Sequence, residues 1–240
     1  MSMTATKTVR ELALENPAAT RVFEKMGIDY CCGGHKPLSE ACAAAKLPVD
    51  EVLSRLEQAE AETARSADGK DGQQESISAL VEHIVSTHHA FVKQESPRIQ
   101  HLLAKVVSVH GKNHPELSQV QELFDGLAEE LSSHMMKEEQ ILFPYLEQMD
   151  KTACNGGSTP SSCFGTVQNP IRMMMIEHDS AGDALRDLRQ VTSNYTAPAD
   201  GCISYKTLYQ AIEGFEKDLH QHIHLENNIL FPRSLAMENV

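Results

Sequence analysis

The sequence predicts an all-α protein, in which a small helical domain precedes a four-helix bundle with an internal repeat. Apolar residues recur at threes and fours in four long stretches, which is the period of an amphipathic helix. The motif His-x-x-x-Glu-x-x-Ile-Leu-Phe-Pro occurs twice, from His134 and from His222. A further histidine precedes each copy by nearly the same distance, since His89 lies 45 residues before His134 and His178 lies 44 before His222. These observations indicate a duplicated helix pair.

Residues 1–65 are predicted to form the small helical domain, which carries cysteines. Asn16 and Pro17 are an N-cap and first-position pair that opens a helix ending at Met26, and Gly27 closes it. A second helix is expected to begin near Pro37, and a third to run over residues 49–64. No alternation of β-branched residues predicts a strand here.

Residues 66–75 are polar and contain glycine, so they are predicted to be a linker that leads into a bundle over residues 76–240. The first helical stripe of the bundle is interrupted at Ser96 and Pro97, and the segment from Met149 to Gln168 is read as a long connection. The four predicted stripes run from Ile77 to His110, from Val120 to Ile141, from Ile171 to Leu185 and from Tyr205 to Ile229.

Charge and composition exclude several classes of partner. With 21 Lys and Arg against 34 Asp and Glu, the net charge of −13 opposes binding to nucleic acid phosphates or anionic membranes. The N-terminus lacks a signal-peptide pattern and no run approaches the roughly 20 apolar residues of a spanning helix, so a cytoplasmic location is expected. Six cysteines are too few for a disulfide scaffold and favour reduced thiols.

The repeated His–Glu pairs are candidate halves of a metal site. Residues four apart on a helix lie on one face, so His134 with Glu138, and His222 with Glu226, reach toward the same point. A single such pair is more often a coincidence, but two copies on apolar stripes favour a metal. If the halves pack about a pseudo-two-fold axis, Glu138 and Glu226 can bridge two ions, with terminal imidazoles from His89, His134, His178 and His222. Imidazoles with few carboxylates in a helical bundle favour iron.

Two histidine assignments stay open at this level. His88 and His89 both continue an apolar stripe, and the repeat distance favours His89. His110 lies 21 residues beyond His89, about 31 Å along one straight helix, so it can ligate only if the chain reverses near Pro97. As a residue of the stripe alone, His110 is equally a core histidine.

The adjacent thiols Cys31 and Cys32 suggest a redox or thiolate role, against the plainer interpretation of two ordinary thiols in a loop. A position ahead of the helix that begins near Pro37 predicts a lowered thiol pKa, and the glycines that follow predict access. The loop is hypothesised to deliver electrons, or to accept iron or NO. The other four cysteines are read as incidental, and they are Cys42, Cys154, Cys163 and Cys202.

Taken together, these motifs resemble the RIC family (repair of iron centres; the YtfE, ScdA and NorA type). The resemblance covers nearly the whole chain. The matching segments are Asp-Tyr-Cys31-Cys32-Gly-Gly, Ser-Ser-His134-Met-Met-Lys-Glu138, Glu-His178-Asp-x-Ala-Gly and His222-x-x-Leu-Glu226-Asn-Asn. It implies a hemerythrin-like bundle and a cytoplasmic di-iron stress-response protein that restores iron–sulfur clusters damaged by nitric oxide or oxidants.

The resemblance also implies a ligand set and partners. The implied ligands of two iron ions are His89, His110, His134, Glu138, His178, His222 and Glu226. NO or another diatomic ligand and damaged iron–sulfur proteins are the implied partners, and the sequence leaves a homodimer open. Two alternatives to an iron donor remain: a hemerythrin-like protein that binds or scavenges NO or O2, and an enzyme that reduces NO.

Overall fold

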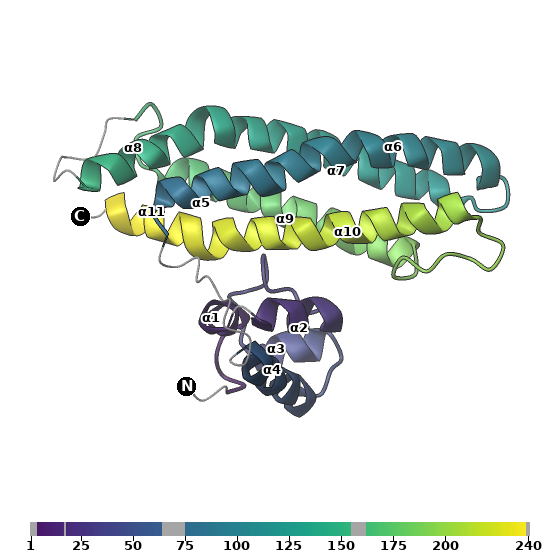
Figure 1. Ribbon diagram of the computed structural model, residues 1–240, viewed down its shortest axis with the longest axis horizontal. Helices are drawn as coiled ribbons and strands as arrows, with labels where there is room; N and C mark the ends of the chain where they lie inside the picture. Colours follow the sequence, from purple (N-terminus) through teal and green to yellow (C-terminus); the bar gives the residue numbers. More distant parts are fainter. Residues whose placement is uncertain (1–3, 17, 64–74, 155–161, 239–240) are drawn as a thin grey trace. The chain divides into compact units, whose positions relative to one another are not determined.

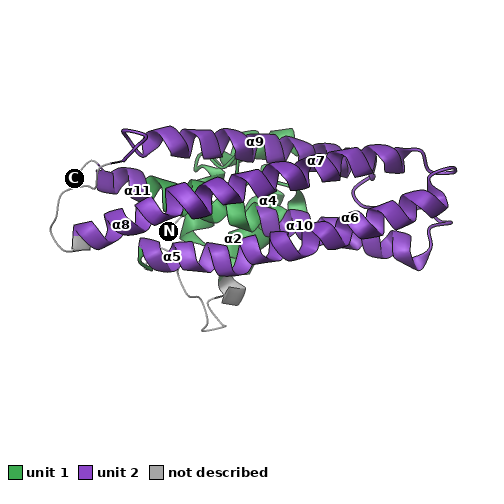
Figure 2. Cartoon of the chain, turned by 90° about the horizontal axis from the view of Figure 1, so that it is seen from above, with its two compact units in different colours: residues 1–76, 220–233 green, residues 77–219, 234–240 purple. Residues whose placement is uncertain are grey.

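A computed structural model describes residues 4–16, 18–63, 75–154 and 162–238. Within these ranges the regular elements are all helices, with one isolated β-bridge between Thr8 and Pro37, so the all-α prediction is confirmed. The chain forms two compact units, one of residues 1–76 and 220–233, the other of residues 77–219 and 234–240 (Figure 2). Most of the predicted linker, residues 66–75, lies outside the described residues.

The first unit contains four short helices. They are α1 (Val9–Glu15), α2 (Ala18–Met26), α3 (Leu38–Ala44) and α4 (Val49–Thr63). Helix α1 is not among the helices predicted from the sequence, although Thr8 and Glu11 form a reciprocal capping box at its start. Gly27 ends α2 with φ +66°, as its position predicted. A continuous core fills this unit, formed by Val9, Leu12, Phe23, Leu38, Val52, Leu56 and their neighbours.

The second unit is built from long helical segments (Figure 1). Their elements are α5 (Ile77–His83), η1 (Ile84–His89), α6 (Ala90–His110), α7 (Glu116–Lys137), η2 (Glu138–Leu142), α8 (Phe143–Cys154), α9 (Gln168–Val191) and α10 (Ile203–Leu225). The residues of α10 from His220 onward belong to the first unit. Helix α7 packs against both α6 and α9. Helix α10 packs against α6 and α7 through Phe215. The centroid of its ring lies 6.2 Å from that of Phe91 in α6 and 5.3 Å from that of Phe124 in α7.

Each of three helical segments contains one π-helical turn, which the sequence analysis did not foresee. These turns are η1, η2 and, after α10, η3 (Glu226–Leu230), which leads into α11 (Phe231–Glu238). A π turn adds a residue to the helical repeat, which shifts the buried face. Ile141 was therefore wrongly placed on the buried stripe: it is 50% exposed, and Leu142 is buried instead at 1%.

The predicted break near Pro97 is also wrong. Helix α6 runs through Pro97 without interruption. Proline costs a hydrogen bond and crowds the preceding turn, but it can be accommodated inside a long helix by local adjustment. The preceding Ser96 donates its hydroxyl to the carbonyl oxygen of Val92 at 2.8 Å, a side-chain bond of the kind that often bends helices.

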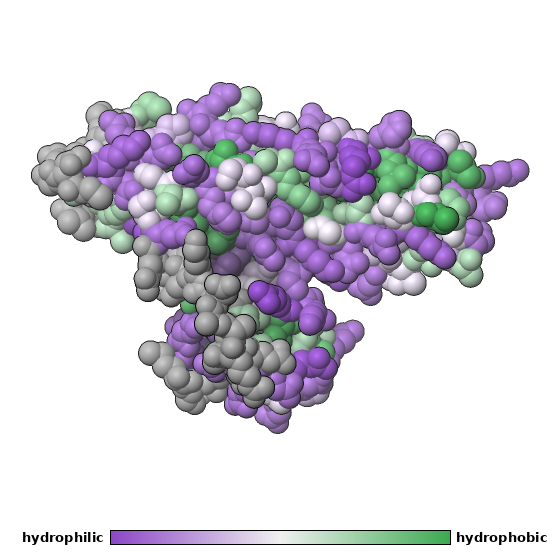
Figure 3. All heavy atoms as spheres, in the orientation of Figure 1, coloured by the Kyte–Doolittle hydropathy of each residue, from purple (hydrophilic) through white to green (hydrophobic). Residues whose placement is uncertain are grey.

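The connection after α8 is shorter than predicted, because α8 continues past Met149 to Cys154. The side chain of Cys154 and residues 155–161 lie outside the described part of the chain. Cys163 is exposed. Hydrophilic residues cover much of the face seen in Figure 3, and apolar ones are dispersed among them. Within the four described ranges, no helix combines the length and apolar composition that a membrane span requires.

Candidate metal centre

Glu138 is the centre of a cluster of buried donors in the second unit. Its side chain is fully buried at the first position of η2, four residues after His134. Oε2 of Glu138 lies 3.3 Å from Nε2 of His134 and 3.4 Å from Nε2 of His89. The π turn η1 ends at His89, so irregular helical turns carry two of these three donors. Such turns are frequent at functional sites because they re-aim side chains.

His178 of α9 completes this group. Its Nε2 lies 3.0 Å from Nε2 of His134, and both rings are buried. The donor atoms of His134, Glu138 and His178 all lie within 4.8 Å of one another, as do those of His89 and Glu138. Two nitrogens that bind one octahedral metal at about 2.1 Å would be about 3.0 Å apart. The arrangement therefore fits a metal ion shared by His134 and His178.

Outer carboxylates hold the far nitrogens of two of these rings. Nδ1 of His89 lies 2.7 Å from Glu139, and Nδ1 of His134 lies 2.8 Å from Glu177. A lysine pairs with each carboxylate, Lys93 with Glu139 at 2.6 Å and Lys137 with Glu177.

These contacts fix the tautomers of His89 and His134. Burial acts to raise the pKa of Glu139 and of Glu177, but the lysine and histidine hydrogen bonds outweigh it and hold both below their usual value. An ionised carboxylate only accepts hydrogen bonds, so Nδ1 of each histidine carries the proton. Nε2 is then left with its lone pair directed toward Glu138, as a metal ligand requires.

The second His–Glu pair belongs to the first unit. His222 lies fully buried in the last turn of α10, and its Nε2 lies 3.0 Å from Oε1 of Glu226, the first residue of η3. The i, i+4 pairing predicted from the sequence is therefore present in both copies. Each copy also places its glutamate at the start of a π turn.

His88 and His110 lie elsewhere. Nδ1 of His88 is 3.0 Å from Asp218, while its neighbour His89 faces Glu138. His110 ends α6, and because α6 does not reverse at Pro97, 21 residues of helix separate it from His89. Its Nε2 instead lies 3.2 Å from Sγ of Cys202. The structure thus does not bring His110 to the cluster, which corrects the assignment carried over from the resemblance.

The thiol loop also differs from its prediction. Cys31 is buried at 5% and Cys32 is half-buried, with 3.9 Å between their sulfurs. The neighbouring Cys32 thiol, burial and the nearby Asp29 carboxylate raise the pKa of Cys31 well above its usual value. The expected lowering is therefore wrong for Cys31, because the hydrogen bond to Cys32, burial and the negative charge of Asp29 all raise its pKa. Cys202, read as incidental, has a pKa lowered to about 7 by the backbone N–H of Tyr205 and by His110.

The outer carboxylates Glu139 and Glu177 are functional candidates that are not among the site residues predicted from the sequence. Asp179 was the acid considered for orienting an imidazole, but Asp179 is exposed and Glu177 makes the contact. Their position next to the predicted ligands could have indicated this role, since Glu177 directly precedes His178 and Glu139 directly follows Glu138. A residue next to an inward-facing position points about 100° away, toward a neighbouring helix.

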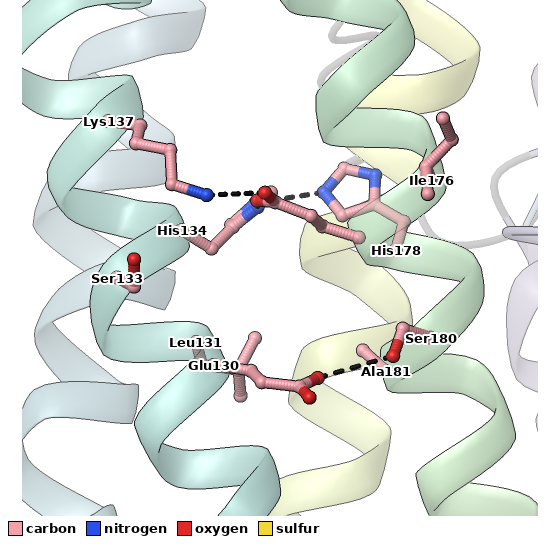
Figure 4. Close-up of a pocket in the computed structure, with 10 residues that line it drawn as sticks. Glu130, Leu131, Ser133, His134, Lys137, Ile176, His178, Ser180 and Ala181 are labelled. Atoms are coloured by element: carbon pink, nitrogen blue, oxygen red, sulfur yellow. Dashed lines mark hydrogen bonds and ion pairs between the residues drawn. The ribbon is translucent and has the colours of Figure 1, made fainter.

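A cavity of about 360 Å³ lies between α7 and α9 beside the cluster. Figure 4 shows His134 and His178 facing each other from the two helices, with Lys137 and Ile176 nearby. Glu130 and Ser180 meet farther along, where the hydroxyl of Ser180 donates to Glu130 at 3.2 Å. The cavity has room for small molecules next to two of the donors.

Comparisons with known proteins match both parts of the chain. Residues 5–60 match the ScdA_N model, described as a domain of unknown function (DUF542), and residues 80–234 match the hemerythrin HHE cation binding domain. A probable iron-sulfur cluster repair protein from Haemophilus influenzae is 36% identical over 231 residues, 96% of this chain and 97% of the relative. The iron-sulfur cluster repair protein YtfE of Escherichia coli O81 (strain ED1a) is 38% identical over 228 residues, 95% of this chain and 96% of the relative.

Proposed function

The chain belongs to the family of iron-sulfur cluster repair proteins, and on this premise we propose that it supplies iron to clusters damaged by nitric oxide or oxidants. The observation that carries the proposal is the buried group of imidazoles around Glu138, two of which, those of His89 and His134, are oriented by outer carboxylates. Damaged iron–sulfur proteins are the expected partners.

We further propose that two iron ions bind, with Glu138 and Glu226 as bridging carboxylates. The proposed terminal ligands are His89, His134, His178 and His222. This set rests on the repeat in the sequence and on the geometry within each half. His110 is omitted because of its position at the far end of α6.

The residues of the chain have distinct tasks in this proposal. Glu139 and Glu177 hold His89 and His134 so that Nε2 faces inward, and Lys93 and Lys137 keep those carboxylates ionised. Bound iron would supply the ions that a damaged cluster has lost and would offer open positions to a small ligand. Because neutral imidazoles outnumber carboxylates, the ligand set leaves positive charge on the metals and favours the ferrous state.

The thiol loop is proposed to assist by accepting iron or by delivering electrons. Cys32 is the accessible member of the pair, since Cys31 is buried. The high pKa of Cys31 means that its proton leaves only when a cation or a reaction partner arrives.

Binding of NO at the iron centre is a second candidate function. The cavity between α7 and α9, which His134 and His178 help to line, supports it. A diatomic molecule in this cavity would meet the donor cluster directly. Repair and NO chemistry share the same site, so an experiment has to separate them.

The decisive experiment combines anaerobic purification, metal analysis and Mössbauer spectroscopy with two activity assays. Two irons per chain are expected, together with recovery of an apo iron–sulfur enzyme in the absence of NO. Turnover of NO without any recovery of that enzyme would select the alternative. Less than one iron per chain after gentle preparation would refute the di-iron proposal.

A further inference from the structure

We propose that the first unit contains its own metal site, in which Asp29, Cys31 and Cys32 bind one divalent ion of the kind that accepts thiolate ligands, Fe²⁺ or Zn²⁺. All three residues belong to the loop between α2 and α3, so the inference concerns this unit alone. It deepens and rests on the proposed function, in which the thiol loop accepts iron or delivers electrons, by naming the ion class and the third ligand.

The spacing of the three donor atoms fits a shared ion. Sγ of Cys31 lies 3.9 Å from Sγ of Cys32 and 3.4 Å from Oδ1 of Asp29, and all three atoms are within 4.8 Å of one another. Ligand bonds of about 2.3 Å to sulfur and about 2.1 Å to oxygen, in a tetrahedron, would give edges of about 3.8 and 3.6 Å. The sulfurs are far beyond the roughly 2.05 Å of a disulfide.

Hydrogen bonds within the loop hold the carboxylate of Asp29 close to the two thiols. Oδ1 of Asp29 accepts hydrogen bonds from the backbone N–H groups of Cys31 at 3.2 Å and of Cys32 at 3.0 Å. These bonds fix one carboxylate oxygen beside both sulfurs. An ion can reach the site from solvent through the exposed carboxylate of Asp29 and the half-buried Cys32. Cys31 is the buried ligand of the three.

The two glycines that follow the cysteines leave room for the close approach of Asp29 and Tyr30. A Cβ at Gly33 would lie 3.1 Å from both the carboxyl carbon and Oδ2 of Asp29, and one at Gly34 would lie 2.8 Å from the carbonyl oxygen of Tyr30. A side chain at Gly33 would crowd the Asp29 carboxylate, and one at Gly34 would force the backbone of the loop to shift. The run Cys-Cys-Gly-Gly therefore builds the site as a unit.

Binding balances as an exchange of protons for the ion. The two thiols release two protons, two metal–sulfur bonds form, and the Asp29 carboxylate adds one metal–oxygen bond. No electron is transferred. The product carries the charge of the ion, two thiolates and one carboxylate, so a divalent cation neutralises most of the negative charge that the loop gathers.

The test is titration of the reduced full-length protein with Co²⁺, followed through the near-ultraviolet charge-transfer band that only thiolate-bound cobalt gives. The cluster around Glu138 contains no thiol and stays silent in this band, so failure of this site and failure of the proposed iron centre can be told apart. One Co²⁺ per chain is expected to saturate the band, and Fe²⁺ or Zn²⁺ is expected to remove it by competition.

Matched variants assign the donors. Cys32→Ser should abolish the band, and Asp29→Asn, which keeps an oxygen for the backbone hydrogen bonds, should weaken Co²⁺ binding at least tenfold. Cys163→Ser and Cys202→Ser, which replace exposed cysteines of the second unit, should leave the band unchanged. An unchanged band in folded Cys32→Ser, or unchanged affinity in Asp29→Asn, overturns the proposal.

A second measurement uses the unmodified protein and so avoids any variant that fails to fold. Saturating Zn²⁺ should slow alkylation of Cys32 at least tenfold while Cys163 reacts at its metal-free rate. Equal alkylation of Cys32 with and without Zn²⁺ would contradict the site.

Discussion

The two copies of the His-x-x-x-Glu motif have the same inward face but different outward faces. In the first copy, only Glu138 and Leu142 of the π turn are buried. The outward-facing Glu139 accepts a hydrogen bond from Nδ1 of His89. In the second copy all five residues of the π turn are buried, from Glu226 to Leu230. The comparison shows that a repeated ligand motif can be kept while its flanking residues acquire separate tasks.

In the second copy, the outward residues hold the start of the thiol loop. The amide of Asn228 donates to the carbonyl oxygen of Tyr30 at 3.1 Å and contacts Nδ1 of His224 at 2.8 Å. Arg10 donates to the carbonyl oxygen of Asn228 at 3.1 Å. The ring of His224 meets that of Tyr30 at 5.3 Å. Tyr30 directly precedes Cys31, so this copy positions the loop from within the first unit.

If both copies are metal half-sites, removal of either glutamate should have the largest effect. Glu138→Ala and Glu226→Ala are each expected to lower iron affinity at least 100-fold, since even outer partners of ligands contribute roughly 10- to 100-fold. Iron per chain after dialysis against a chelator measures this. Glu129→Ala, at an exposed position of α7, is the control. Normal iron content in Glu226→Ala would show that only the first copy binds metal.

The second-largest difference between the two copies is expected in the pH dependence of the unfolding free energy. Burial lowers the pKa of His224 to about 4, below the usual value near 6.5. Between these values the unfolded chain binds more protons, so stability is lost as the pH falls from about 6.5 to about 4, by about 3 kcal/mol at the limit. Urea unfolding at several pH values measures the slope.

His224→Gln should flatten that slope. Met136, the counterpart of His224 in the first copy, is exposed and does not titrate, so Met136→Gln should leave the pH profile unchanged. An identical acid-side slope in His224→Gln would assign the effect to other groups.

A smaller difference is expected from the paired positions Asn228 and Gln140. Asn228→Ala leaves the carbonyl of Tyr30 without this donor in a buried place and should cost about 2 kcal/mol of unfolding free energy. Gln140→Ala removes an exposed side chain and should change stability by less than about 0.5 kcal/mol. Chemical denaturation measures both, and equal costs would mean that the second copy is not specialised.

The smallest effect should come from the outward carboxylate of the first copy. Glu139→Gln keeps an acceptor for Nδ1 of His89 but loses its charge, so iron affinity should fall roughly tenfold. Competition with a chromophoric chelator measures the change. Glu177→Gln tests the equivalent contact to His134, and a result within error of the parent for both variants would limit these residues to surface ion pairs.

The sequence by itself determined the helical class, the His–Glu pairs and the choice of His89 over His88 as the residue near Glu138. These follow from periodicity and repeat distance, which are local properties of a chain. It also predicted the caps of α2, since Asn16 and Gly27 act within one turn.

Only the tertiary structure decided the rest. Periodicity assumes a constant 3.6 residues per turn, so it could not foresee the π turns that bury Leu142 in place of Ile141. It could not show that α6 passes through Pro97 and carries His110 away, because that depends on how the freed backbone groups are accommodated. Adjacency to the ligands marks Glu139 and Glu177 in the sequence, but their contacts to His89 and His134, like the high pKa of Cys31, arise from tertiary packing and burial.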